Sequence, residues 1–200
     1  GTEKELFTLP ELIDVFSIDR VHKAGAKFDF EKAKWFNHEY MKGKSGKELA
    51  AYIEPVLKEK GIVAPADYVE KVCEVVKQRS TLTHELWQNS YFFFEEPMEF
   101  EEAVVRSKWN EVAKKSFLLL ESELEKWSEF EPAAIDKFLH EFLQANALKA
   151  GDILPLLRVM LIGTKNGPAV FEIISLLGKE KVVDRMKKAA ASFDKIIAIV

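Results

Sequence analysis

The chain has 200 residues, of which 48% are hydrophobic and 31% charged, a composition typical of a folded domain and not of a disordered one. Its single cysteine, Cys73, excludes an internal disulfide and a four-cysteine zinc site. No signal peptide and no apolar run of about 18 residues is present, so we expect a soluble cytoplasmic protein with no membrane partner. The chain lacks an initial methionine, and we expect it to be part of a longer protein.

The net charge of −4 is unevenly distributed along the chain. Residues 61–148 contain 9 basic and 17 acidic side chains, whereas residues 149–200 contain 9 basic and 5 acidic ones. Proteins that bind nucleic acid usually offer a basic surface to the phosphates. The sequence therefore predicts that a polyanion would bind the C-terminal quarter.

Apolar residues repeat at helical spacing through most of the chain, and no segment alternates as a strand would, so we predict an all-α fold. Ser45 and Glu48 have the spacing of a capping box, and Asp29 is a candidate N-cap. The predicted helices are, in chain order, residues 9–16, a segment after Asp29, 46–59, 65–78, an aromatic-rich segment ending at Phe94, 101–128, 133–147, 152–162, 168–177 and 179–197.

Glycine and proline separate these segments. A turn is expected at residues 23–26, Gly61 is expected to end the helix over residues 46–59, and residues 95–97 are expected to form a linker. The last three helices are separated by turns that contain Gly163, Gly167 and Gly178.

Motifs that would indicate catalysis or metal binding are incomplete. His84 and Glu85 begin a zinc-protease pattern, but position 88 is Gln instead of the second histidine. Cys73 lies among valines at helical spacing, as expected for a packed core residue. We therefore predict no catalytic residue, no metal and no cofactor in this chain.

Two polar residues remain as candidates for ligand binding. Arg158 is the only charged residue in the apolar segment 153–162, so its guanidinium must have a partner, either a structural ion pair or an RNA base edge or phosphate. His140 lies opposite the apolar face of the helix over residues 133–147, where it is either solvated or able to contact an unstacked base.

These candidates lie in a chain that resembles bacterial glutamyl-tRNA synthetases at both ends. Residues 7–13 (FTLPELI), 16–32 (FSIDRVHKAGAKFDFEK) and 35–37 (WFN) are similar to the stretch that follows the catalytic lysine motif of this family. Residues 155–180 (PLLRVMLIGTKNGPAVFEIISLLGKE) are similar to its last anticodon-binding block. The resemblance implies that residues 1–62 end the stem-contact region and form a helical connector. It also implies two helical anticodon-binding units, residues 63–100 and 101–200.

The resemblance further implies a function. The nucleotide-binding signature and lysine-rich loop of the family are absent here, so this part should not activate glutamate. The parent enzyme would be a monomeric ligase that uses ATP and magnesium to attach glutamate to its tRNA. The residues implied to contact the anticodon loop are Arg79, which would read the third base, His140, Arg158, Gly167, Pro168, Val170 and Phe171.

This chain departs from the family pattern at two of the implied sites. His140 stands where a family member has a base-contacting arginine, so that contact would be weakened or different. Lys165 occupies a turn that more often contains arginine, and it could contact a phosphate as a point charge.

Two other functions are compatible with an all-α chain. A helical protein-interaction module would use the aromatic cluster over residues 87–94 and would expose an apolar patch. A helix-turn-helix DNA binder would need a basic recognition helix, but acidic residues interrupt the basic ones over residues 179–188, so no DNA partner is expected.

Overall fold

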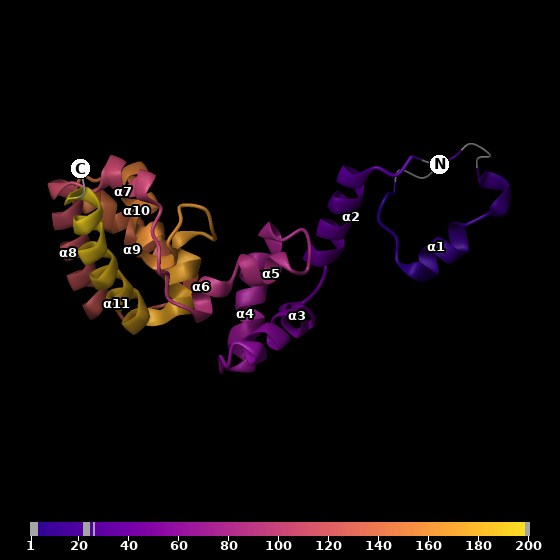
Figure 1. Ribbon diagram of the computed structural model, residues 1–200, viewed down its shortest axis with the longest axis horizontal. Coiled ribbons are helices and arrows are strands. Elements are labelled where there is room, and N and C mark those ends of the chain that lie inside the picture. Colours follow the sequence, from indigo (N-terminus) through magenta and orange to yellow (C-terminus); the bar gives the residue numbers. More distant parts are fainter. Residues whose placement is uncertain (1–3, 22–24, 26, 199–200) are drawn as a thin grey trace.

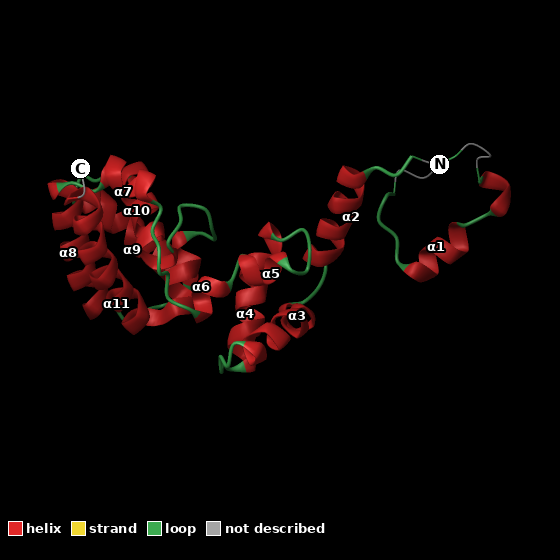
Figure 2. Ribbon diagram, viewed as in Figure 1, coloured by secondary structure: helices red, strands yellow, loops and turns green. Residues whose placement is uncertain are grey.

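The computed structural model describes residues 4–21, 25 and 27–198. All secondary structure in this part of the chain is helical, so the predicted all-α fold is confirmed (Figure 2). The turn expected at residues 23–26 lies almost wholly outside the described residues. The helices are α1 (Leu9–Val15), η1 (Ile18–Arg20), α2 (Phe30–Lys42), α3 (Gly46–Glu59), α4 (Ala66–Val76), η2 (Lys77–Arg79), α5 (Glu85–Gln88), α6 (Tyr91–Phe94), α7 (Glu102–Lys108), α8 (Glu111–Lys126), α9 (Pro132–Ala145), α10 (Ala150–Ile162) and α11 (Val170–Ala198).

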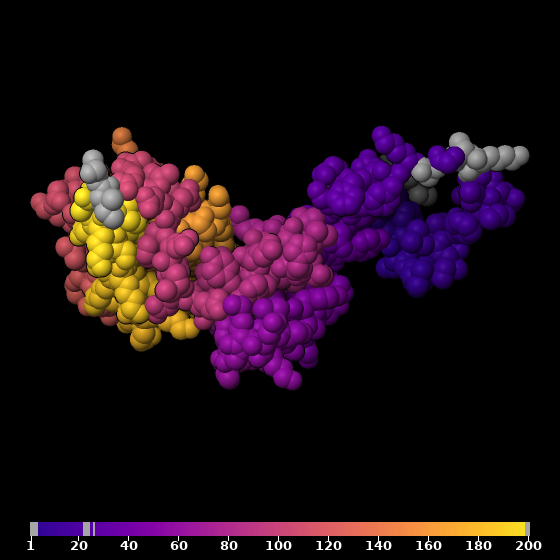
Figure 3. Space-filling model, viewed as in Figure 1, coloured from indigo at the N-terminus to yellow at the C-terminus, as the bar shows by residue number. Residues whose placement is uncertain are grey.

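The helices are arranged along an extended molecule (Figure 1). The described residues up to Lys42 form an arm that contains α1 and α2, and residues 46–198 form the body. Within the body, α3 and α4 pack closely against each other, and α7 to α11 form a bundle at the end opposite the arm. The space-filling view shows the arm projecting from this body (Figure 3).

Side-chain caps begin two of the helices as predicted. The backbone N–H of Glu48 donates to Ser45 Oγ over 3.3 Å, and the N–H of Ser45 donates to the Glu48 carboxylate over 2.9 Å, at the start of α3. Asp29 accepts a hydrogen bond of 3.0 Å from the N–H of Lys32 at the start of α2. These contacts satisfy amide groups that a helix start leaves without partners. Gly61 follows α3 with a φ of 69°, as expected for a helix end.

The predicted long helix over residues 101–128 is wrong, because the chain turns a corner at Trp109 and Asn110 between α7 and α8. Asn110 Oδ1 accepts hydrogen bonds of 3.0 Å from the N–H groups of both Val112 and Ala113 and so caps α8. Trp109 is 6% exposed, and its indole N–H donates to Asp194 over 2.9 Å. Burial of the Trp109 indole and the cap by Asn110 together stabilise this corner more than continuation of the helix would.

Gly178 divides α11 into two helical segments, as predicted. Its φ of 75° and ψ of 165° lie outside the helical region and are easily adopted only by glycine. The segment before this kink packs beside α10, and the segment after it returns along the bundle (Figure 1).

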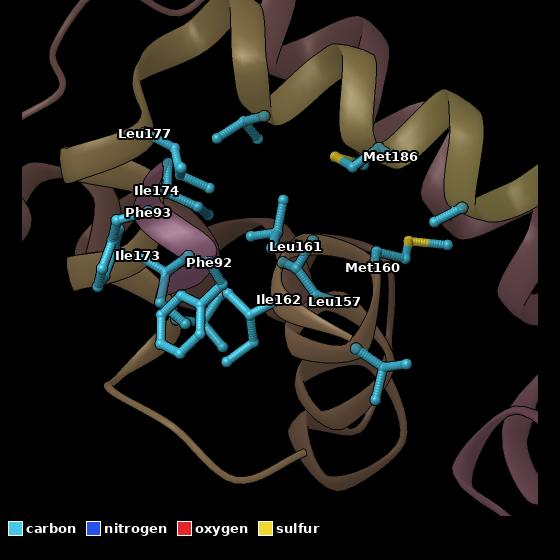
Figure 4. Close-up of a cluster of buried hydrophobic side chains, with 14 of the residues drawn as sticks. Phe92, Phe93, Leu157, Met160, Leu161, Ile162, Ile173, Ile174, Leu177 and Met186 are labelled. Carbon is cyan, nitrogen blue, oxygen red and sulfur yellow. The ribbon is translucent and has the colours of Figure 1, made fainter. Parts of the chain in front are cut away.

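The core of the bundle includes the aromatic cluster that an interaction module would have exposed. Phe92 is 3% exposed and Phe93 is fully buried. Both project from α6 toward Ile162 of α10 and Ile173 of α11 (Figure 4). Trp87, Tyr91 and Phe94 pack against this core and are partly buried. The aromatic cluster thus holds α6 on the bundle and leaves only part of its surface to a partner.

Candidate nucleic-acid interface

The turn over residues 163–168 connects α10 to α11 and is held in place by the chain just before α7. Gly163 has a φ of 83°, and a Cβ atom there would lie 2.6 Å from the carbonyl oxygen of Glu99. The N–H of Glu101 donates to the Gly163 carbonyl over 2.8 Å. Only glycine fits this position, because the backbone of Glu99 occupies the space of a side chain.

Glu101 also binds the turn through its side chain. Its carboxylate accepts hydrogen bonds of 2.9 Å from the N–H of Lys165 and 3.3 Å from the Thr164 hydroxyl, and the Lys165 ammonium lies 2.9 Å away. The N–H of Lys165 and then its ammonium lower the pKa of Glu101. Lys165, predicted to contact phosphate, is therefore already paired. Exposed ion pairs contribute only about 0–1 kcal/mol, so a phosphate could replace Glu101 as its partner.

Arg158 lies on α10 beside this turn and is half-buried. Its Nε donates to the Pro168 carbonyl over 3.1 Å, and its Nη1 donates to the Lys165 carbonyl over 2.9 Å. No carboxylate forms an ion pair with Arg158 among the described residues, so the structural ion pair considered from the sequence is absent there. The guanidinium is oriented by the turn, and no described residue accepts a hydrogen bond from its Nη2.

Arg79 ends η2, and its backbone is held from two sides. Its carbonyl accepts a hydrogen bond of 3.1 Å from Asn89 Nδ2. The next residue, Ser80, is fully buried, and its carbonyl lies 2.9 Å from His38 Nδ1 on α2. The Arg79 side chain is exposed, and its guanidinium has no hydrogen-bond or ion-pair partner in the part of the chain that the structure describes. A fixed backbone therefore carries a side chain that can reach a ligand.

The two arginines lie close enough to affect each other. The pKa of Arg158 is lowered, first by its burial and second by the positive charge of Arg79. Like charges held near each other favour a ligand that supplies negative charge or hydrogen-bond acceptors between them. Planar guanidinium groups fit phosphates and the acceptor edges of bases. Arg79 and Arg158 are therefore candidates for contacting an electron-rich planar or anionic ligand.

The remaining residues of the predicted turn have different surroundings. A Cβ atom on Gly167 would lie 2.5 Å from Ile162 Cδ1, so a larger residue there would require the end of the Ile162 side chain to move. Pro168 is buried and Val170 is 4% exposed, so their side chains face the core. Phe171 packs against the core but stays half-buried. Of these apolar side chains, Phe171 offers the most surface to a ligand.

The backbone amides at the start of α11 are only partly available to a ligand. The N–H of Ala169 donates to the Glu172 carboxylate over 2.9 Å. This contact closes the helix start from within the chain, as in a capping box. A ligand at this turn would therefore meet the arginines more directly than the helix amides.

His140 is not linked to the other candidate residues. It is exposed on α9, and its Nδ1 lies 2.9 Å from the Asp136 carbonyl one turn earlier on the same helix. No hydrogen bond, ion pair or ring contact joins it to the turn or to the two arginines in the described part of the chain. Its role in RNA binding stays a prediction.

Comparison with known proteins identifies the family of this chain. The family described as "anticodon binding domain" matches residues 48–190, which is more than half of the chain and includes every candidate residue. The chain belongs to this family. Two similar curated proteins are the glutamate-tRNA ligases of Flavobacterium johnsoniae, 37% identical over 96% of this chain, and of Phocaeicola vulgatus, 38% identical over 94%.

Solved structures agree with this relationship. The glutamate tRNA ligase from Elizabethkingia meningosepticum, crystallised in complex with its amino acid, superposes with a TM-score of 0.83 and 30% identity over 95% of this chain. The glutamate-tRNA synthetase from Elizabethkingia anophelis gives 0.77 and 29% over 94%. The chain spans 37–38% of the length of these relatives.

Within this anticodon-binding domain, the sequence did not single out the acidic residues that surround the basic ones. Lys187 lies 3.3 Å from Glu121 and 3.1 Å from Glu125, and Lys188 lies 2.9 Å from Glu96. Three of the nine basic residues of the C-terminal quarter, Lys165, Lys187 and Lys188, are therefore paired with carboxylates of the acidic segment before it.

No described group of histidine, cysteine, aspartate and glutamate side chains has the arrangement of a metal site. Among the helices that the structure describes, none has a continuous apolar stretch that could cross a lipid bilayer. Cys73 is fully buried, and burial raises the pKa of its thiol to about 12, so it is not an activated nucleophile.

Proposed function

We propose that this chain recognises the anticodon loop of a glutamate-specific tRNA, as the C-terminal part of a glutamate-tRNA ligase. The observation that carries the proposal is that Arg79 and Arg158, from different helical units, keep guanidinium nitrogens without a partner among the described residues: Arg158 is bonded only through Nε and Nη1, and the exposed Arg79 side chain has no partner. Anticodon bases are unstacked and offer their hydrogen-bonding edges, which arginine side chains can read. The names of the relatives supply the amino acid.

In this proposal each candidate residue has a role. Arg79 reads the third anticodon base and Arg158 reads a second base. The turn supports the bases through the backbone of Gly167 and Pro168 and through Phe171, whereas Val170 holds the turn on the core. Lys165 exchanges Glu101 for a phosphate, and His140 contacts the RNA from the exposed face of α9.

The rest of the proposal concerns the longer protein. The chain would end a monomeric cytoplasmic ligase whose other domains bind ATP and magnesium and attach glutamate to the tRNA. Residues 1–62 would end the stem-contact region and connect it to the two recognition units, residues 63–100 and 101–200.

The test is binding of the chain to a glutamate tRNA transcript, a transcript with a changed third anticodon base, and an unrelated tRNA, at two salt concentrations. Arg158→Ala should weaken binding of the glutamate tRNA about tenfold to a hundredfold, as expected when one arginine contact to a base edge is lost. Arg79→Ala should selectively reduce discrimination at the third base.

The control variant is Lys115→Ala, which removes one positive charge from an exposed residue of α8 outside the candidate site. It should reduce affinity slightly and equally for all three tRNAs, because nonspecific phosphate attraction depends on total charge. Equal binding of the three tRNAs at both salt concentrations, with both arginine variants behaving like Lys115→Ala, would contradict anticodon recognition.

A further inference from the structure

Arg185 is a buried cation that the proposed site does not use. It lies on α11 and is 4% exposed, and no ion pair joins it to a carboxylate among the described residues. Its Nη1 donates to the carbonyls of Phe92 over 2.7 Å and of Leu161 over 2.6 Å, and its Nη2 donates to the Glu95 carbonyl over 2.9 Å. Its Nε has no hydrogen-bond partner within the described part of the chain. A buried charge is costly, and the three carbonyls offset that cost for the two terminal nitrogens, so this residue has a specific structural task.

The three acceptors belong to the ends of two different helices. The carbonyls of Phe92 and Glu95 lie at the end of α6, and that of Leu161 lies in the last turn of α10. Helix C-termini carry carbonyls without intrahelical partners and attract positive charge. One nitrogen, Nη1, donates to both helix ends, and Nη2 of the planar fork adds a second contact to the end of α6, which a single ammonium nitrogen would not hold in the same fixed geometry.

These two helices lead to the two halves of the proposed interface. α10 carries Arg158 and continues into the turn over residues 163–168. α6 ends the unit that contains Arg79, and Asn89, two residues before α6, donates a hydrogen bond of 3.1 Å to the Arg79 carbonyl. Arg185 thus connects α10, which carries Arg158, to α6, which directly follows the residue that supports the backbone of Arg79.

The surroundings of Arg185 form a joint between the two units. Phe92 and Phe93 project from α6 toward Ile162 and Ile173, and Met186 directly follows Arg185 on α11 (Figure 4). The Tyr68 hydroxyl of α4 donates to the Phe93 carbonyl over 3.0 Å. Apolar packing holds α6 and α10 together but is not directional. The hydrogen bonds of the guanidinium are directional and fix the angle between the two helices.

We propose that Arg185 is a positioning residue for anticodon recognition, which holds the two helical units in the one relative orientation that brings Arg79 and Arg158 together. This inference rests on the proposed function. Without Arg185, each unit keeps its own helices, but the joint samples several orientations. Apparent affinity falls in proportion to the fraction of molecules that keep the competent orientation.

The test uses Arg185→Met, which removes the donors, and Arg185→Lys, which keeps the charge but not the fork. The control is Leu120→Ala, which removes a fully buried side chain from α8 and destabilises the bundle outside the joint. Two readouts are compared: affinity for the glutamate tRNA transcript, and the distribution of distances between spin labels on the two units.

Labels are attached at Lys71→Cys on α4 and Lys137→Cys on α9, whose side chains are 68% and 75% exposed. The native Cys73 can stay in place, because it is fully buried and its pKa is raised to about 12. Circular dichroism establishes that each variant retains its helices. Urea denaturation measures how far each one is destabilised.

We expect Arg185→Met to broaden the distance distribution and to weaken tRNA binding about tenfold, if about a tenth of the molecules keep the competent orientation. Arg185→Lys should give a smaller change in both readouts, and it decides the question if Arg185→Met does not fold. Leu120→Ala should lower stability while leaving the label distances and affinity close to those of the parent.

Unchanged distances and affinity in the Arg185 variants would overturn the inference, as would equal changes in Leu120→Ala. Failure of the proposed function is recognised separately. If Arg158→Ala binds the glutamate tRNA as tightly as the parent chain, the chain does not read the anticodon through this site, whatever the label distances show.

Discussion

The arm and the body begin two of their helices in the same way but differ in what those helices bury. Thr8 and Glu11 form a capping box at the start of α1, as Ser45 and Glu48 do at the start of α3. No residue of α1 is buried, whereas five residues of α3 are. A cap satisfies the backbone at a helix start, but most helix stability comes from packing of an apolar face.

The arm is also rich in apolar side chains that remain on the surface. Phe16, Ile18 and Phe28 are 68%, 74% and 73% exposed. The continuous core instead begins at Met41, at the end of α2, and runs from α3 to α11, where it includes Phe93 and Leu161. All candidate anticodon-binding residues lie on this body, so the proposed interface is built on the part of the chain that supports itself.

The largest effect should come from removing a phenylalanine from the body. Phe93→Ala deletes a fully buried ring at the joint and should lower the free energy of unfolding by about 3–5 kcal/mol. Phe28→Ala deletes a ring of the arm that is 73% exposed and should change it by less than about 0.5 kcal/mol. Urea denaturation followed by circular dichroism measures both values.

Equal destabilisation by the two phenylalanine variants would show that the arm shares the core of the body. The comparison between arm and body would then fail.

A smaller effect is expected from the two matched caps. Ser45→Ala should lower the free energy of unfolding by about 1 kcal/mol, because α3 is part of the cooperative core. Thr8→Ala removes the same type of cap from α1 but should leave global unfolding unchanged, because α1 can open without disturbing the body. Amide hydrogen exchange, read residue by residue, should show faster exchange in α1 alone for Thr8→Ala.

If Thr8→Ala lowered the free energy of unfolding as much as Ser45→Ala does, α1 would belong to the same cooperative unit as α3.

Local signals in the sequence predicted a large part of this fold. Ser45 and Glu48 marked the start of α3, and Gly61 and Gly178 marked helix ends, because each acts through backbone groups within a few residues. The corner at Trp109 and Asn110 was missed, because burial of the indole depends on Asp194 in α11. A residue with a distant partner gives no signal at its own position.

The candidate site could be predicted only in part for the same reason. The apolar segment around Arg158 showed that this side chain needs a partner, but the carbonyls of the turn were not foreseeable. The approach of Arg79 to Arg158 depends on how the two helical units are joined. Arg185 was one basic residue among several in α11, and its burial depends on carbonyls more than 20 residues away in the sequence.

The smallest effect is expected in how the stability of the chain falls at acidic pH. It is tested on two carboxylates, one in the arm and one in the body. In the arm, the pKa of Glu11 is lowered to about 2, chiefly by its hydrogen bond with Lys4 and then by the N–H of Thr8. In the body, the pKa of Glu101 is lowered from its ordinary value of 4.5 by the contacts with Lys165. A lowered pKa means that the stabilising contact is complete above the ordinary pKa and is lost as the pH falls through the folded-state value.

Glu101 pins the turn to the body, so its protonation should reduce global stability, whereas protonation of Glu11 loosens only the arm. We therefore expect Glu101→Gln to reduce the fall in urea midpoint between about pH 5 and pH 3, and Glu11→Gln to leave the profile of the parent chain unchanged. Denaturation at several pH values tests this directly. If Glu11→Gln flattened the profile as much as Glu101→Gln, the carboxylate of the arm would be coupled to global unfolding, and the cap and core variants would then be expected to show that coupling as well.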